Sequence, residues 1–187
     1  MITGEWLNPP PAAENDGSDL VVTAGKGSDF WRTTSYGYNR DSGHAFLAPL
    51  GPEAAIEVSF IADYDHQFDQ AGLLLRLDET TWIKAGAEYC DGELQLGAVV
   101  TRDVSDWSSA PVPWTGREVT LRASRSGDAV TIRARAGDDP WHLIRLAPFP
   151  ADVPATAGPY CCAPERDGLT VRFTRVSIGE PDDALHA

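Results

Sequence analysis

The chain is poor in basic residues. Its 187 residues include 15 Lys and Arg against 28 Asp and Glu, so the formal net charge at pH 7 is −13. Binding to the phosphates of a nucleic acid or to an anionic membrane surface requires clusters of Lys and Arg. The charge therefore argues against nucleic acid and against a membrane as partners. Long apolar runs are also missing, and none approaches the roughly 18 residues of a membrane-spanning helix.

Cysteine is scarce, with Cys90, Cys161 and Cys162 as the three examples. An odd number, with two residues adjacent, is a poor disulfide framework and is typical of a reducing compartment. Because no C-x-x-C spacing or neighbouring His accompanies the adjacent pair, we expect these thiols to pack as small apolar side chains. The first 17 residues lack both the basic start and the apolar core of a signal peptide. We therefore expect a cytoplasmic protein.

Helical spacing of apolar residues is absent, and alternation with a period of two dominates instead. The clearest predicted strand covers 81–89, and its two faces carry Ile83, Ala85, Ala87 and Tyr89 on one side and Trp82, Lys84, Gly86 and Glu88 on the other. Asp91 and Gly92 predict a tight turn into a second strand at 93–101. Further strands are expected at 55–63, 71–78, 117–125, 129–137, 141–149 and 169–179, with shorter ones at 18–25, 30–34 and 44–50.

About a dozen strands without intervening helices must form two sheets, since each half-apolar sheet has one face to cover. We predict an all-β fold, a two-sheet antiparallel β-sandwich of jelly-roll type. One domain is expected over 1–178. The segment 179–187 has no apolar pattern, so we expect a frayed C-terminal tail there.

The side of the 81–89 strand that faces away from the predicted core carries Trp82, Lys84 and Glu88, an unusual set for a wet surface. Three predicted loops, at 28–44, 63–72 and 105–114, add aromatic residues next to polar ones. In a structural interpretation the aromatic residues cover the ends of the sandwich, and Lys84 and Glu88 form a surface ion pair worth under about 1 kcal/mol. In a functional interpretation, aromatic planes stack on sugar rings while polar side chains bind the hydroxyl groups.

Several motifs in a fixed order resemble the DUF1349 family. They are SDFWRTT (28–34), YGY (36–38), GH (43–44), YDHQFDQAGLLLR (64–76), WIKAGAEYCDG (82–92) and VVTRDVSDWS (99–108). The resemblance runs from about residue 6 to residue 178. It implies a fold of the concanavalin A-like lectin/glucanase superfamily, in which the ligand usually lies on the concave sheet. The candidate ligand-binding residues are Trp31, Tyr36, Asp69, Gln70, Arg76, Trp82, Lys84, Glu88, Asp106 and Trp107.

The sequence offers little for catalysis or metal binding, and the resemblance supplies no catalytic residues. Glycoside hydrolysis needs two carboxylates about 5–10 Å apart, one with a raised pKa. We expect Lys84 to lower the pKa of Glu88, which is unfavourable for a general acid, and Asp69 or Asp106 would have to supply the second carboxylate. The acidic run 63–69 has oxygen ligands but lacks a calcium-loop pattern. No cofactor and no metal are predicted.

These considerations favour binding of a carbohydrate or another small molecule on the concave face, with Trp31, Trp82 and Trp107 stacking on the ligand. One alternative is a protein-interaction module that regulates a metabolic enzyme such as enolase. The resemblance implies it, because the family is similar to the yeast regulator-of-enolase protein. A second alternative is a glycoside-processing enzyme.

Overall fold

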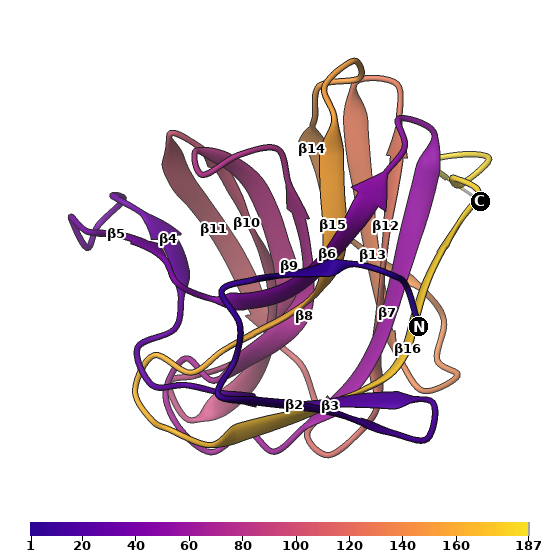
Figure 1. Ribbon diagram of the computed structural model, residues 1–187. Coiled ribbons are helices and arrows are strands. Elements are labelled where there is room, and N and C mark those ends of the chain that lie inside the picture. The colour runs from indigo at the N-terminus through magenta and orange to yellow at the C-terminus, as the bar shows by residue number, and fades with distance from the viewer. Residues whose placement is uncertain (187) are drawn as a thin grey trace.

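The computed structural model describes residues 1–186, which form sixteen strands joined by turns and loops (Figure 1). In chain order these are β1 (Glu5–Leu7), β2 (Ala12–Asp16), β3 (Asp19–Ala24), β4 (Phe30–Arg32), β5 (Asn39–Asp41), β6 (His44–Leu50), β7 (Ala54–Ala62), β8 (Gln70–Arg76), β9 (Thr81–Cys90), β10 (Glu93–Arg102), β11 (Val104–Pro111), β12 (Val119–Ser126), β13 (Ala129–Ala136), β14 (His142–Pro148), β15 (Ala155–Cys162) and β16 (Leu169–Gly179). Over residues 1–186 no helix has the length and apolar character to cross a membrane.

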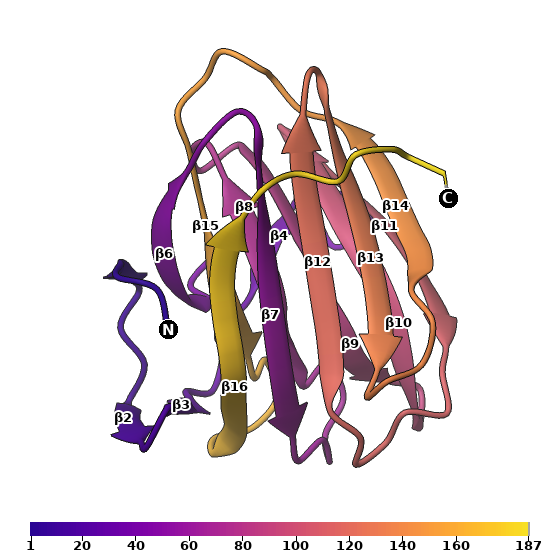
Figure 2. The ribbon, with the colours of Figure 1, turned by 90° about the vertical axis from the view of Figure 1, so that its right-hand side faces the viewer.

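Two sheets of seven antiparallel strands pack face to face. The first sheet has the order β1-β6-β15-β8-β9-β10-β11, and the second has the order β14-β13-β12-β7-β16-β3-β2. Figure 2 shows the second sheet from outside, with β16, β7, β12, β13 and β14 side by side. The predicted all-β, two-sheet antiparallel sandwich is therefore confirmed.

The core between the sheets is built from the alternation seen in the sequence. In β9 the side chains of Ile83, Ala85 and Ala87 are buried against residues of the second sheet such as Val58 and Leu121. Burying such side chains contributes about 25 cal/mol per Å² of apolar surface, which fixes the register because a slip of one residue would turn the polar face inward. The opposite face of β9, with Lys84 and Glu88, therefore points away from the second sheet.

Several strands were not predicted. The segment 105–114 was expected to be a loop, but Val104–Pro111 forms β11 at the edge of the first sheet. An edge strand with most of its side chains exposed needs no alternation of apolar and polar residues, so its sequence gives little indication that it is a strand. The short strands β1, β2 and β5 escaped prediction for the same reason, because their residues are mostly exposed or half-buried.

A second layer covers part of the outer face of the first sheet, by which we mean the face turned away from the second sheet. It consists of residues 29–41, which we call the arm, including the β4–β5 hairpin (Figure 1). The arm forms a second apolar cluster with this face, made of Phe30, Trp31, Ala45, Leu74, Trp82, Val99, Tyr160 and Cys162. The outer face is therefore partly buried, and the uncovered part lies next to the arm.

The C-terminal segment differs from the expected frayed tail. Residues that follow β16 cross the outside of β12 and β13 (Figure 2). Asp182 forms ion pairs with Arg122 and Arg133, and its backbone N–H donates to Ser124 Oγ at 2.8 Å. Two arginines thus hold a segment that has no apolar side of its own.

All three cysteines are free and buried. Burial raises the pKa of the Cys90 thiol to about 11 and that of Cys161 to about 12. Protonated thiols of this kind are poor nucleophiles, so the side chains act here as small apolar groups.

Candidate functional site

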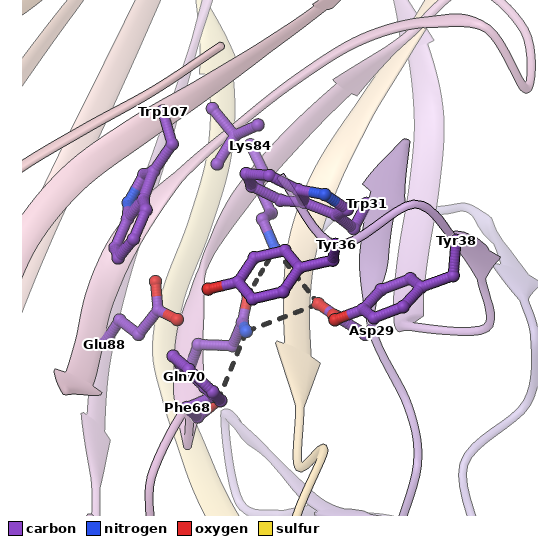
Figure 3. A pocket seen from close by; sticks show the side chains of 10 residues that line it. Asp29, Trp31, Tyr36, Tyr38, Phe68, Gln70, Lys84, Glu88 and Trp107 are labelled. Atoms are coloured by element: carbon purple, nitrogen blue, oxygen red, sulfur yellow. Dashed lines mark hydrogen bonds and ion pairs between the residues drawn. The ribbon is translucent and has the colours of Figure 1, made fainter. Parts of the chain in front are cut away.

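A pocket opens on the outer face of the first sheet, where the arm leaves that face uncovered. Its lining residues are Asp29, Trp31, Tyr36, Tyr38, Phe68, Gln70, Lys84, Glu88, Val99 and Trp107 (Figure 3). The space between these side chains, including its open mouth, is about 360 Å³. Aromatic rings form most of the walls, and the charged and amide groups lie between them.

The strand register brings one part of the lining together. Lys84 of β9 lies opposite Val99 of β10, which in turn lies opposite Trp107 of β11. On the other side of β9, Gln70 of β8 lies opposite Glu88. Because residues directly opposite in a sheet share a face, these five side chains all point to the outer side.

The arm contributes the remaining aromatic wall. Its turn contains three residues with positive φ, Thr33, Ser35 and Gly37, which reverse the chain sharply. Trp31 Nε1 donates to the carbonyl oxygen of Thr34 at 2.9 Å. Tyr36 contacts Trp31 edge-on with 5.4 Å between ring centroids, and the ring of Trp107 stands perpendicular to Trp31 at 6.5 Å. The wall is thus fixed by contacts within the protein.

A buried polar network forms the floor of the pocket. Lys84 Nζ lies 3.2 Å from Asp29 Oδ1 and donates to Gln70 Oε1 at 2.7 Å. Gln70 Nε2 donates to the carbonyl oxygen of Phe68 at 3.2 Å, which fixes the orientation of the amide. Burial acts to lower the pKa of Lys84, but Asp29, Cys162 and Glu88 together outweigh it and raise the pKa. The floor therefore holds a charged ammonium and its carboxylate partner.

Glu88 differs from the other charged groups of the pocket, because its carboxylate accepts no hydrogen bond from any residue within 1–186. Burial raises the pKa of Glu88 to about 7, although the nearby Lys84 acts in the opposite direction. The expectation that Lys84 would leave Glu88 with a lowered pKa is therefore wrong. Loss of hydration, which the sequence pattern could not show, is the larger effect.

A row of glycines extends the hollow beside the pocket. Gly72, Gly86 and Gly97 lie opposite one another on β8, β9 and β10. A Cβ atom at Gly86 would meet the carbonyl group of Ala71 and would lie 3.0 Å from the hydroxyl oxygen of Tyr160. The missing side chains leave a second, smaller hollow that shares Lys84 and Glu88 with the pocket. Glu88 and Trp107 thus stand where the two hollows meet.

The structure brings six of the ten candidate residues to the pocket. These are Trp31, Tyr36, Gln70, Lys84, Glu88 and Trp107. The residues that sequence reasoning left out of the candidate set are Asp29, Tyr38, Phe68 and Val99. Asp29 and Phe68 lie in connecting segments, where alternation gives no direction. Val99 shares the face of Lys84, but it reads as an ordinary core residue.

The other four candidates lie outside the pocket. Trp82 shares the face of Lys84 as expected, but it is 1% exposed beneath Phe30 of the arm, so it cannot stack on a ligand. Arg76 forms a two-pronged ion pair with Asp41 of the arm, with both N–O distances at 2.7 Å. It holds the arm and does not reach the pocket.

Asp69 and Asp106 have structural contacts as well. Asp69 is fully buried, where its Oδ2 accepts from the backbone N–H groups of Asp65 and His66 and pairs with Arg166 at 2.7 Å. The acidic run 63–69 is therefore a turn closed by an arginine. Asp106 points to the other side of β11 and pairs with Arg145 of β14 at 2.8 Å. Residues 1–186 hold no cluster of three or more His, Cys, Asp or Glu that could bind a metal.

Comparison with known proteins gives a consistent picture. Residues 6–181 match the family described as "Protein of unknown function (DUF1349)". The chain is 37% identical over 187 residues to "Regulation of enolase protein 1" of Saccharomyces cerevisiae. The aligned region covers 100% of this chain and 94% of that protein. A crystal structure described as a functionally unknown protein from the same yeast superposes with a TM-score of 0.91 at 36% identity, over 96% of this chain and 97% of the other.

More distant structures share the fold alone. The GH43 protein BlXynB of Bacillus licheniformis has a TM-score of 0.67 at 11% identity, over 86% of this chain and 32% of the other. Lectin I-B4 of Griffonia simplicifolia has a TM-score of 0.55 at 14% identity, over 89% and 90% of the two chains. The lectin likeness agrees with the sandwich architecture expected from the resemblance. By the match over residues 6–181 and the full-length similarity to the yeast protein, the chain belongs to the DUF1349 family.

Proposed function

We propose that the pocket binds a small hydroxylated ligand, a saccharide or a sugar derivative. The observation that carries this proposal is the combination of aromatic walls with a polar floor. Trp31, Tyr36 and Trp107 surround Gln70, Lys84 and their partners (Figure 3). Aromatic faces suit the C–H surface of a sugar ring, and a few fixed polar groups suit its hydroxyl groups.

The charge of the pocket supports the same ligand class. The positive charge of Lys84 is neutralised by Asp29. No free cation among the lining residues therefore remains to attract a phosphate or a carboxylate, so an anionic ligand is disfavoured.

Titration calorimetry with a panel of mono- and disaccharides tests the proposal. Trp107→Ala and Tyr36→Ala should weaken binding at least tenfold, because each removes one aromatic wall. Trp141→Ala is the matched control, since Trp141 lies outside the pocket under the guanidinium group of Arg135. The proposal fails if no sugar of the panel binds, or if Trp107→Ala binds as tightly as the wild type.

A second candidate function is regulation of a metabolic enzyme by direct contact, which the name of the yeast relative, "Regulation of enolase protein 1", favours. Exposed apolar side chains on two edge strands offer a contact surface, namely Val104 of β11 and Leu143 and Leu146 of β14. Co-purification with enolase tests this function. The double variant Leu143→Ser, Leu146→Ser should lose enolase, whereas Trp107→Ala should retain it. Absence of enolase from wild-type preparations would contradict this function.

A glycoside-processing activity would use Glu88 as its acid, since burial raises the pKa of that carboxyl to about 7. Asp29, the other carboxylate of the pocket, is tied through Oδ1 to Lys84 and to the backbone N–H of Phe30. Product analysis on the same sugar panel tests this activity. Turnover that disappears in Glu88→Gln would support it, and absence of turnover in the wild type would contradict it.

The proposed location is the cytoplasm. The support is chemical, since all three cysteines are free and buried. Cell fractionation of a tagged protein tests the location, and recovery in a secreted fraction would contradict it.

A further inference from the structure

The charges of the pocket are not balanced when Glu88 is ionised. Lys84 and Asp29 neutralise each other across 3.2 Å. Glu88 has no ion-pair partner and no hydrogen-bond donor within residues 1–186, although Lys84 lies four residues away on the same face of β9. Glu88 is half-buried, so its unpaired carboxylate has lost part of its hydration, and the site gains when a ligand brings a compensating charge or proton.

The surroundings of Glu88 suit a cation. Figure 3 shows its carboxylate pointing into the space between Trp107 and Tyr36. The negative faces of aromatic rings attract ammonium groups by about 0.5–2 kcal/mol for each contact. A carboxylate among such rings offers a direct counter-ion in addition. A hydroxyl group in the same place would leave the negative charge uncompensated.

We infer that the pocket selects a ligand that carries an ammonium group beside its hydroxyl groups, such as an amino sugar, and that Glu88 is the counter-ion of this group. The inference rests on the proposed function, because the hydroxyl-binding floor and the aromatic walls are those already assigned to a sugar. It adds the feature that distinguishes the ligand from neutral sugars.

The groups that face Glu88 decide how binding responds to pH. They are Lys84 of the same strand, Asp29 and Tyr36 of the arm and Tyr160 of β15. Burial raises the pKa of both tyrosines, so they stay neutral, and Lys84 stays charged beside Asp29. Glu88 is therefore the group that changes its charge near neutral pH. An ammonium ligand should bind more tightly as Glu88 ionises, whereas a neutral ligand that accepts a hydrogen bond from protonated Glu88 should bind more weakly.

The experiment compares glucose with mono-amino glucoses that carry the amine on the second, third or sixth carbon, since the orientation of the ring is not fixed in advance. Binding is measured by calorimetry to the wild type and to Glu88→Gln, which keeps the shape and removes the charge. The pH dependence is measured from pH 6 to pH 8 with the sixth-carbon amine, which stays protonated over this range. Tetramethylammonium serves as a cation without hydroxyl groups. Circular dichroism and the urea midpoint show that both proteins are folded.

At least one amino derivative should bind the wild type at least tenfold more tightly than glucose does. The affinity of the sixth-carbon amine should rise by about tenfold from pH 6 to pH 8, as expected for a ligand that binds the ionised form of a group with a pKa near 7. Glu88→Gln should bind the amino derivatives no better than glucose and should lose this pH dependence.

The outcomes separate this inference from the proposed function. Equal binding of glucose and all amino derivatives to both proteins would overturn the inference and leave sugar binding in place. Binding of tetramethylammonium that depends on Glu88, without binding of any sugar, would support the counter-ion and overturn the sugar site. No binding of any probe would overturn both.

Discussion

Lys84 carries a positive charge in a place where its exposed fraction is 4%. Asp29, itself 8% exposed, compensates this charge, and Gln70 supplies the acceptor that completes the lysine's contacts. Such a buried pair is costly to break, because removal of one member leaves the other charge without a partner. The pair therefore fixes the position of the arm against β9 at the floor of the pocket.

Lys84→Met should lower the free energy of unfolding by about 3–5 kcal/mol, because Asp29 then remains buried without its cation. The double variant Lys84→Met, Asp29→Asn should recover part of this loss. Urea denaturation followed by circular dichroism measures both. Lys26→Met is the matched control, since that lysine is exposed. If Lys84→Met were as stable as the wild type, the ion pair would contribute nothing to the free energy of unfolding.

Glu88 makes stability depend on pH in the direction opposite to most carboxylates. Its pKa rises from 4.5 to about 7 on folding, so the folded state holds a proton that the unfolded state releases. Stability should fall between about pH 4.5 and pH 7 by about 1–3 kcal/mol from this group, since a tenfold change in an acid constant corresponds to about 1.4 kcal/mol. Urea midpoints of wild type and Glu88→Gln across this range isolate the contribution. If the urea midpoints of the two proteins change by the same amount with pH, Glu88 does not make this contribution.

The arm is the element on which the pocket depends. Phe30, Trp31 and Tyr38 pack into the outer apolar cluster, and polar contacts hold the rest of the arm. Arg76 clamps Asp41, and the backbone N–H of Arg32 donates to Ser105 Oγ at 2.9 Å. Removal of one clamp should therefore loosen the arm without unfolding the sandwich.

Arg76→Ala should increase hydrogen exchange over residues 30–41 and weaken ligand binding several-fold. The free energy of unfolding should change by only about 1 kcal/mol, since the pair with Asp41 is partly exposed. Hydrogen exchange followed by mass spectrometry measures the local effect. Arg145→Ala, which breaks a similar pair on another edge, should leave exchange of the arm unchanged. Unaltered exchange in Arg76→Ala would mean that the apolar contacts alone hold the arm.

On the scale of the whole molecule, polar contacts close the open sides of the sandwich. Arg145 of β14 reaches across to Asp106 and Ser108 of β11 and thereby ties the edges of the two sheets together. On the outside of the second sheet, the C-terminal segment lies across Arg122 and Arg133. Both sets of contacts give charged side chains a partner at places where no further strand covers the sheet.

Asp182→Ala should lower the free energy of unfolding by about 1–2 kcal/mol, because it removes the carboxylate shared by two partly buried arginines. Proteolysis should then cut the segment after residue 179 more readily. Asp183→Ala is the neighbouring control. Identical urea midpoints and identical proteolysis for Asp182→Ala and the wild type would contradict a role for the tail in stability.

The architecture was predictable because burial leaves a period-two pattern. The strands 81–89 and 93–101 were predicted within a residue of β9 and β10, and the outward direction of Lys84 and Glu88 followed from the same alternation. The edge strand β11 and the held tail were not predicted, since exposed backbone pairing and ion pairs between distant residues leave no periodic signal. Arg76 and Asp106 were placed in the site because their distant partners, Asp41 and Arg145, were unknown.

The sequence by itself determined the two-sheet sandwich and which side chains leave the core, because the free energy of apolar burial depends on residue type and local spacing. The tertiary structure decided what surrounds those outward side chains. It buried Trp82 under the arm, brought Asp29 onto Lys84 and left Glu88 without a partner among residues 1–186. The physical reason is that contacts between distant segments, and the loss of hydration that they cause, arise when the chain closes on itself.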